Sequence, residues 1–480
     1  MRNKQLTCAL AKAAICLVAS ANAATVEPDY GSPAPCDPTR TRAVERLVEV
    51  VTAVQTGAGA NVSSVLDRDW APSAQGARAE AEPTLLRWTR GNQNLHLIEV
   101  CARSHTGASA FYQNGLTGLI DFINLTVEED GDGRITTVFS RAGFRTEPDP
   151  AYRHNDSARV AKLNAFVDVL SARGLFSGVV LVARNGIPIY TRTNGTTGAN
   201  NRPIEVGDVF EMASSTKMFT AVAIFQLIEH GQLSLDTTLA QAAPAVVPSE
   251  VPAAYANRIQ LRHLLSHTSG IKDGADVPVD APSRSFAYAN TNFYLLGKVI
   301  EAVSGMRYED YLRIHVLGPL GMANTSRFEM TRASDALVTG YMSEVSGGRV
   351  RLVANPLLQT IQGGAQGGYY STAGDMLRFT TALREGRLIS RESLDAMRSV
   401  HPELGATVYG FGMVRWRGRG IWGHAGDLPG ADVDVEIYGD TPYTAIVLSN
   451  VDDGNYPLIA KIRALFFPEG GSGPPQRLVP

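Results

Sequence analysis

The segment Ser214–Ile228 reads Ser-Ser-Thr-Lys-Met-Phe-Thr-Ala-Val-Ala-Ile-Phe-Gln-Leu-Ile. After Lys217 the residues are apolar on almost every side of a helix, which predicts a helix buried at the centre of a domain. Residues three apart share a helical face, so Ser214 and Lys217 are expected to lie side by side at its first turn. Burial disfavours charge on the lysine and makes it a better base for an adjacent serine nucleophile. On this spacing alone, an N-cap serine followed by an exposed lysine is the alternative.

A second Ser-x-x-Lys spacing runs from Ser269 to Lys272, but Gly270 follows the serine directly and indicates a loop. At Ser214, by contrast, the first turn of a long helix offers backbone N–H groups and the positive end of the helix dipole. Both features stabilise a developing oxyanion. We therefore take Ser214 as the candidate nucleophile.

Two further short patterns contain residue types that acyl-transfer chemistry uses. Tyr288-Ala289-Asn290 precedes an apolar helical pattern, and a Tyr and an Asn two apart in such a loop can face one cleft. Alone, a buried structural Tyr with a capping Asn is the commoner outcome. The stretch 423–426 reads Gly-His-Ala-Gly before an alternating strand, and a Gly-rich strand edge allows close approach of a substrate backbone.

Taken in order, Ser-x-x-Lys, Tyr-x-Asn and His-x-Gly resemble the three motifs of the serine β-lactamase and penicillin-binding superfamily. The fit is closest to its class C-like branch, which includes D,D-carboxypeptidases, D-aminopeptidases and esterases. Segments 264–271 and 367–376 also look like connecting segments of that branch, so the resemblance spans roughly residues 160–466. It implies an α+β catalytic domain of the β-lactamase/transpeptidase type, with an antiparallel sheet, flanking helices and a helical subdomain.

By this resemblance Ser214 is acylated, Lys217 activates it, and Tyr288 carries a proton to the leaving group. Which of Lys217 and Tyr288 is the working base stays open. The groups implied to bind the substrate or its oxyanion are Asn290, His424, Gly426 and the backbone N–H groups of Ser214 and Asp427.

The third motif departs from the usual Lys-Thr-Gly, because His424 and Ala425 supply a titratable imidazole and no hydroxyl. We expect such an imidazole to grip a substrate carboxylate only while protonated. The resemblance therefore implies a small ester, amide or peptide as substrate and no cofactor, with esterase or D-amino-acid peptidase activity ranked above β-lactamase or D,D-carboxypeptidase activity. A non-catalytic binding or sensor protein that keeps the fold is the alternative of another class.

The remaining patterns exclude several other classes of site. His263 and His267 are four apart, but Leu264 stands where a zincin needs Glu, so we expect no metal site there. Residues 128–139 begin like a calcium loop and end on Phe139 instead of Glu, so Asp132-Gly133 is better read as a hairpin turn. The net charge of −3 comes without a basic run, which argues against nucleic acid as a partner.

Residues 1–23 have the pattern of a secretory signal peptide, with Arg2 and Lys4 before an apolar stretch and cleavage expected after Ala23. No later apolar run is long enough for a membrane span. We therefore expect a periplasmic or secreted protein. Its two remaining cysteines, Cys36 and Cys101, allow one disulfide, with two unpaired thiols as the alternative.

Breaks rich in Pro and Gly divide the 480 residues into more than one domain. Helices are expected over 160–170 and 458–467, and strands over 178–183, 187–193, 408–416, 433–437 and 444–448. Early and late strands around a helical middle predict one antiparallel sheet closed by both ends of the domain. The helix-then-sheet order before it resembles NTF2-like modules. The expected division is a signal peptide (1–23), a linker (24–40), an NTF2-like α+β module (41–146), a linker (147–156), the hydrolase domain (157–468) and a flexible tail (469–480).

Overall fold

The computed structural model describes residues 41–467 apart from 57–58, 90–94, 130, 146–150, 152–154, 199, 246–250, 274–281, 283–284, 328–335, 347–348, 356–362, 417–419 and 440. The expected signal peptide, first linker and tail lie outside the described residues, as does Cys36. Cys101 is buried and takes part in a disulfide, so its pairing with Cys36 stays a prediction. Within the described ranges, no helix is both long and apolar enough to cross a bilayer.

The N-terminal module packs helices against an antiparallel sheet whose strand order is β1-β2-β3-β4. Its strands alternate between faces, and apolar residues of one face, such as Ile123 and Leu125, join the helices in one core. The likeness to NTF2-like modules stays a prediction. The elements are α2 (Arg42–Gln55), α3 (Gly59–Asp69), α4 (Gln75–Thr89), β1 (Leu95–Ala102), β2 (Gly107–Asn114), β3 (Ile120–Val127) and β4 (Ile135–Arg145).

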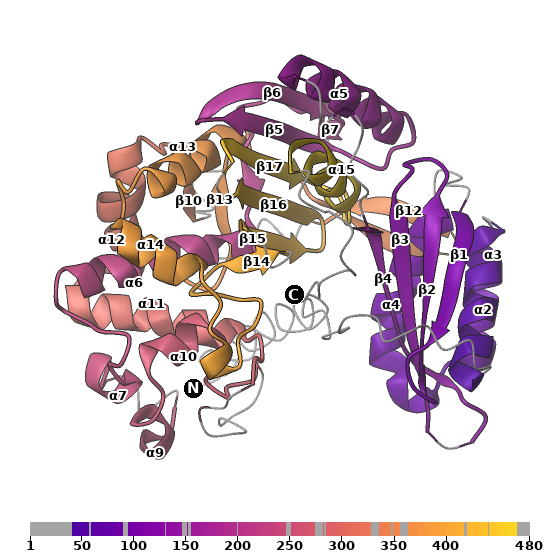
Figure 1. The fold of residues 1–480 in the computed structure, drawn as a ribbon, viewed down its shortest axis with the longest axis horizontal. Helices are drawn as coiled ribbons and strands as arrows, with labels where there is room; N and C mark the ends of the chain where they lie inside the picture. Colours follow the sequence, from indigo (N-terminus) through magenta and orange to yellow (C-terminus); the bar gives the residue numbers. More distant parts are fainter. Residues whose placement is uncertain are drawn as a thin grey trace, which may run out of the picture.

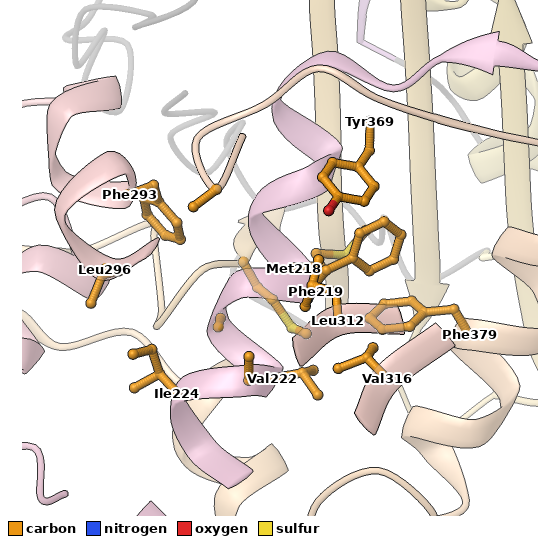
Figure 2. Packing of buried hydrophobic residues seen from close by; sticks show 14 of the residues in the cluster. Met218, Phe219, Val222, Ile224, Phe293, Leu296, Leu312, Val316, Tyr369 and Phe379 are labelled. Carbon is orange, nitrogen blue, oxygen red and sulfur yellow. The ribbon is translucent and has the colours of Figure 1, made fainter. Parts of the chain in front are cut away.

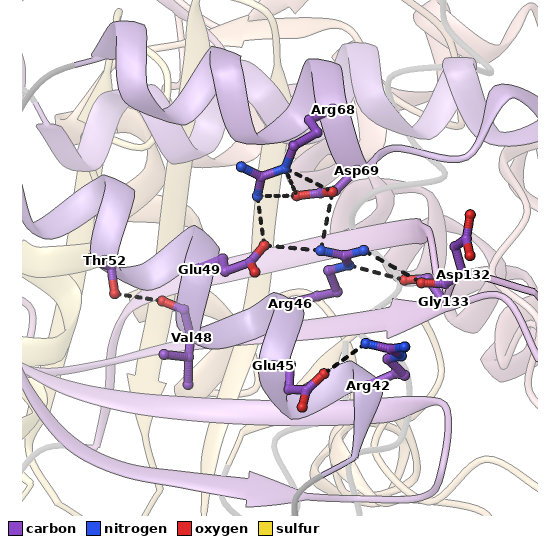
Figure 3. Close-up of polar contacts among 10 residues, drawn as sticks. All are labelled: Arg42, Glu45, Arg46, Val48, Glu49, Thr52, Arg68, Asp69, Asp132 and Gly133. Carbon is purple, nitrogen blue, oxygen red and sulfur yellow. Dashed lines mark hydrogen bonds and ion pairs between the residues drawn. The ribbon is translucent and has the colours of Figure 1, made fainter.

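A polar network ties helix α2 to helix α3 and to the β3–β4 turn (Figure 3). The guanidinium of Arg46 lies 3.1 Å from carboxylate oxygens of both Glu49 and Asp69, and it also donates to the carbonyls of Asp132 and Gly133. Gly133 adopts a positive φ of 61° between two antiparallel strands, which confirms the predicted hairpin turn.

The larger domain is built on an antiparallel sheet in which six described strands follow the order β14-β15-β16-β17-β5-β6. Strands from the start and the end of the domain are neighbours here, because β17 pairs with β5. This confirms the predicted closure of one sheet by both ends of the domain. The strands are β5 (Gly178–Arg184), β6 (Ile187–Asn194), β14 (Val414–Trp416), β15 (Ile421–Leu428), β16 (Ala431–Tyr438) and β17 (Tyr443–Ser449).

Two hydrophobic cores lie on opposite faces of this sheet. On β5, Val179 and Leu181 face one core, whereas Val180 and Val182 face the other, as the two-residue period of a strand requires. Helices α5 (Asp156–Ala172) and α15 (Tyr456–Phe466) cover the second core (Figure 1). A buried ion pair anchors α15 to the sheet, because Arg463 Nε lies 2.9 and 3.1 Å from the carboxylate oxygens of Glu436 on β16.

The first core surrounds helix α6 (Lys217–Glu229), the helix predicted to be buried. Phe219, Val222 and Ile224 point to different sides of α6, and each meets apolar side chains from other elements (Figure 2). Phe219 packs edge-on against Phe379 with ring centroids 4.8 Å apart. The helical part of the domain consists of α6 with α7 (Leu239–Ala242), α9 (Ala253–Ala256), α10 (Leu261–Leu265), α11 (Asn290–Ser304), α12 (Tyr308–Leu312), α13 (Ala373–Arg384) and α14 (Arg391–Arg398). Helices α11 and α12 pack directly on α6.

The structure shortens one strand expected from the sequence and adds another. The strand expected over 408–416 is reduced to β14, because residues 408–413 form turns and bridges instead. Strand β15, which contains the His-x-Gly pattern, runs for eight residues that the sequence did not mark as a full strand, since its glycines are poor strand formers. Short strands complete the domain: β7 (Thr196–Thr197), β8 (Arg202–Pro203), β9 (Phe210–Glu211), β10 (Ser326–Arg327), β11 (Tyr341–Ser346), β12 (Arg349–Ala354) and β13 (Tyr369–Ser371).

The module and the larger domain share contacts despite the linker between them. Strand β4 packs on α15, and α4 packs on the hairpin β11–β12. Leu119 of the module is buried in the same core cluster as the inner face of α15. The two units therefore share more surface than the expected linker implied.

Removal of the module is predicted to lower stability without unfolding the larger domain. A chain that begins at Asn155 keeps the N-cap of α5, whose side-chain oxygen accepts the N–H of Ala158. Its thermal midpoint, followed by circular dichroism, should fall below that of the full chain because the removal uncovers apolar surface of α15. The full-chain variant Leu119→Ala should fall between them. Equal midpoints for all three proteins would show that the shared surface contributes nothing.

Candidate active site

Ser214 and Lys217 lie together at the foot of helix α6. Ser214 belongs to a short turn of 3-10 helix (Ala213–Thr216) that leads directly into α6. The amine Nζ of Lys217 lies 2.9 Å from the hydroxyl Oγ of Ser214, and Lys217 is fully buried. The alternative of an exposed lysine behind an N-cap serine is therefore wrong.

The Lys217 amine has two further neighbours, both of which are acceptors. It donates to the side-chain oxygen Oδ1 of Asn290 at 2.7 Å and to the backbone carbonyl of Gln366 at 2.5 Å. Burial lowers the pKa of Lys217 to about 7, against the opposing effect of the Asp273 carboxylate. With Ser214 Oγ included, three oxygen atoms lie within hydrogen-bond distance of the amine and can accept from it. The lowered pKa, and not this geometry, is what makes an unprotonated amine available near pH 7.

Tyr288 approaches the serine from the other side. Its hydroxyl donates to Ser214 Oγ at 2.9 Å, and its ring centroid lies 4.9 Å from Lys217 Nζ. Burial raises the pKa of Tyr288 well above its usual range, so the side chain is a neutral phenol near pH 7. A neutral phenol is a proton donor, whereas the neutral amine beside it is a proton acceptor.

Asn290 opens helix α11, and a carboxylate fixes this end of the helix. Asp273 accepts the backbone N–H groups of Asn290 and Thr291 at 2.8 and 2.9 Å. These are N–H groups that a helix cannot satisfy internally. The side-chain nitrogen Nδ2 of Asn290 is buried and has no hydrogen-bond partner among the described residues. Its Oδ1 is committed to Lys217, so Nδ2 is the part of Asn290 that remains for a substrate carbonyl.

Ala213, the residue before Ser214, has a strained backbone conformation that a hydrogen bond to Glu211 stabilises. Ala213 has a positive φ of 42°, which is unfavourable for a residue with a side chain. Its N–H donates at 2.9 Å to the buried carboxyl of Glu211. Burial raises the pKa of this carboxyl to about 8. Sequence reasoning missed Glu211, Asp273 and the Gln366 carbonyl. Gln366 directly precedes the 367–376 segment that carried the family resemblance, and that position is the signal that could have found it.

Strand β15 runs beside the turn that carries Ser214. A side chain at Gly426 would place its Cβ 2.3 Å from the carbonyl oxygen of Met212, so only glycine permits this approach. The absent side chain thus makes room for the nucleophile's own segment, whereas the sequence suggested room for a substrate. Asp427 follows Gly426 on β15, half-buried and paired in register with Asp432. Its N–H as part of the oxyanion hole stays a proposal.

His424 is placed differently from the expectation for an anion contact. It is 3% exposed, its Nδ1 donates to the carbonyl of Ala425 at 2.5 Å, and its Nε2 accepts from the hydroxyl of Tyr409 at 2.9 Å. Burial lowers the pKa of His424 to about 3. Both nitrogens of the neutral ring are already paired, so the expectation of an imidazolium that grips a carboxylate has to be corrected.

The other serine and the two histidines considered from the sequence form hydrogen bonds within the protein. Ser269 is fully buried, and its hydroxyl donates to the side-chain oxygen of Asn292 at 2.6 Å. A buried and bonded hydroxyl does not suit a nucleophile. The ring of His263 accepts the N–H of Gln260 and caps α10, and the ring of His267 accepts the N–H of Ala289. In the part of the chain that the structure describes, no group of three His, Cys, Asp or Glu residues could hold a metal ion.

Comparison with known proteins matches the larger domain. The family model described as Beta-lactamase matches residues 161–466. Penicillin-binding protein 4* of Bacillus subtilis is 30% identical over 337 residues, which cover 61% of this chain and 72% of that protein. Esterase EstB of Burkholderia gladioli is 28% identical over 319 residues, which cover 55% and 80% of the two chains. The crystal structure of a D-stereospecific amidohydrolase from Streptomyces has a TM-score of 0.52 at 26% identity, covering 65% of this chain and 99% of that chain.

The two Ser-x-x-Lys serines are predicted to differ in reactivity toward a fluorophosphonate. Ser214 should be labelled stoichiometrically because its Oγ has a base within 2.9 Å, whereas Ser269 should stay unlabelled because its hydroxyl is buried and bonded. Mass spectrometry of peptides from the wild type, Ser214→Ala and Ser269→Ala would locate the label. A label on Ser269, or one that persists in Ser214→Ala, would contradict the assignment.

Proposed function

The chain belongs to the beta-lactamase family of serine hydrolases, and from this premise we propose that it cleaves small esters or amides through an acyl-enzyme at Ser214. The observation that carries the proposal is the 2.9 Å contact between Ser214 Oγ and a buried lysine amine. We also propose that the protein is exported. That part rests on the sequence of residues 1–23, which lie outside the described residues.

Lys217 is the base of the acylation step in this proposal. The neutral amine takes the proton from Ser214 Oγ while Oγ forms a bond to the substrate carbonyl carbon, and the carbonyl oxygen becomes an oxyanion. Tyr288 cannot take this role near pH 7, because burial holds its pKa high and keeps the phenol protonated. The proposed stabilisers of the oxyanion are the backbone N–H groups of Ser214 and Asp427.

Tyr288 is the acid of the same step. When the oxyanion collapses, the bond from carbon to the leaving oxygen or nitrogen breaks, and the leaving atom takes the phenol proton. The phenolate then regains a proton from the Lys217 ammonium, whose nitrogen lies 4.9 Å from the ring centre. Water then attacks the acyl-enzyme, and the same proton transfers run in reverse. Ser214, Lys217 and Tyr288 thereby return to their starting protonation states. Asn290 Nδ2 is the proposed contact for the substrate's acyl side.

The third motif supports a neutral substrate over a carboxylate-bearing one. A β-lactam or a peptide ending in D-alanine carries a carboxylate, which the usual motif binds with a permanently charged lysine. Here His424 is neutral and both its nitrogens are paired within the protein. We therefore place esters and amides without a carboxylate first, with β-lactamase or D,D-carboxypeptidase activity as the alternative.

The rate of acylation is predicted to rise with pH through the pKa of Lys217. At pH below about 7 the amine is protonated and cannot accept the serine proton, so kcat/KM for a p-nitrophenyl ester should climb and then level off above that pH. Lys217→Ala should lower kcat/KM by ~10²- to 10⁴-fold, the scale of a lost general base, and remove this limb. Lys298→Ala, which removes a partly exposed lysine paired with Glu301, is the matched control. A wild-type profile that is flat from about pH 5 to about 9, roughly two units on each side of the Lys217 pKa, would rule out the neutral-lysine mechanism.

His424 is predicted to contribute nothing to anion binding. Hydrolysis of a neutral ester and of its analogue with a carboxylate on the acyl group is measured against pH, with nitrocefin as a β-lactam probe. The ratio of the two kcat/KM values should follow the same curve in the wild type and in His424→Gln, because the imidazole is already neutral at these pH values. The neutral ester should also be turned over faster than nitrocefin. A ratio that changes with pH in the wild type alone would restore the imidazolium contact.

A further inference from the structure

His267 occupies a conformation and an environment that both cost free energy. It follows helix α10 with a positive φ of 56°, and its side chain is fully buried. Its ring nitrogen Nε2 has no hydrogen-bond partner among the described residues. An apolar residue would avoid the unpaired nitrogen, and glycine would avoid the strain. The imidazole must therefore provide something that compensates for both.

What the residue provides is a three-point hold on Tyr288. The carbonyl of His267 accepts the N–H of Ala287 at 2.8 Å, and its Nδ1 accepts the N–H of Ala289 at 3.2 Å. Its ring stacks on the Tyr288 ring with centroids 4.2 Å apart and an interplanar angle of 28°. The N–H groups of the two residues that flank Tyr288, and the Tyr288 ring itself, are thus held by one residue.

The hold requires a neutral imidazole. A backbone N–H can donate only to an unprotonated Nδ1, so the single ring proton resides on Nε2. Burial, followed by the nearby Lys217 and His424, lowers the pKa of His267 well below its usual range. The rings of Phe286, Phe293 and Tyr409 also lie around the imidazole, at centroid distances of 4.8 to 5.9 Å. Burial and the two nearby basic groups outweigh the opposing effect of the hydrogen bond with Ala289, so the imidazole stays neutral.

We propose that His267 is a positioning residue that sets the place of the Tyr288 phenol, so that its proton reaches the leaving group. The proposal rests on the proposed function, in which Tyr288 is the acid of acylation. A residue that only fills the core would affect every substrate alike. A residue that places the acid affects a substrate according to how much its leaving group needs a proton.

Two esters with the same acyl group separate these roles. From p-nitrophenyl butyrate the leaving phenolate departs without a proton, whereas from ethyl butyrate the leaving oxygen needs one. The measured quantity is the ratio of kcat/KM for ethyl butyrate to that for p-nitrophenyl butyrate. Because both values refer to the same enzyme sample, the ratio is independent of the fraction of folded protein. Titration of Ser214 with a fluorophosphonate gives that fraction separately.

Two substitutions divide the contacts of His267. His267→Phe keeps an aromatic ring and loses the acceptor for Ala289, and we expect it to lower the ratio by about tenfold or more, within the range of lost acid catalysis. His267→Asn keeps a side-chain acceptor and tolerates positive φ, so its ratio should stay closer to the wild type. Ser266→Ala is the matched control: it removes hydrogen bonds to the Arg262 carbonyl and to Thr268 in the same segment and should leave the ratio unchanged.

The double variant His267→Phe/Tyr288→Phe decides whether the effect acts through the phenol. In the Tyr288→Phe background the ratio is already low, and His267→Phe should lower it no further. An equal loss on both esters, or a further fall in the double variant, would overturn the proposal. Turnover that survives Ser214→Ala would instead overturn the proposed function itself, so the two failures are distinguishable.

Discussion

The site depends on the burial of a single amine without its charge. Lys217 is fully buried at the start of helix α6, where an ammonium ion loses its hydration. The three groups that accept from the amine are the Ser214 hydroxyl, the Asn290 amide and the Gln366 carbonyl, and none of them carries a negative charge that would hold an ammonium. A more polar pocket would keep the lysine charged, and Ser214 would then have no base. The hydrophobic packing around α6 is therefore part of the chemistry.

Distant elements of the domain converge on that amine and its serine. Strand β15 lies against the turn before α6 because Gly426 has no side chain, and Ser215 Oγ donates to the carbonyl of His424 at 3.1 Å. The segment 267–273 supports the second motif at three points. His267 holds the backbone around Tyr288, Ser269 bonds Asn292, and Asp273 caps the start of α11. Strand β15 and the segment 267–273 thus together position the hydrogen-bonding atoms of the site.

Features set by short spacing were predictable from the sequence, and features set by tertiary contacts were not. The buried helix, the Ser214–Lys217 pair and the sheet closed by both ends of the larger domain follow from periodicity, spacing and order. The acceptor role of the Gln366 carbonyl leaves no trace in residue type, because any residue supplies a carbonyl. From the sequence alone, His424 is expected to titrate like an ordinary histidine. Its burial and its hydrogen bond to Tyr409 change that expectation, and both arise only when the chain folds. Ser269 shares the Ser-x-x-Lys spacing, and Gly270 after it is the sequence feature that separates it from Ser214.

An NMR titration of the lysine side chains measures whether Lys217 is a neutral amine near pH 7, on which the proposed chemistry depends. The chain has seven lysines, so spectra of protein labelled with ¹³C at lysine Cε contain few signals, which can be followed individually. We predict one signal that titrates at a pKa of about 7 and disappears in Lys217→Arg. If every lysine signal instead titrates near the ordinary lysine pKa of about 10.4, the amine is charged in the resting site and cannot be the base of acylation.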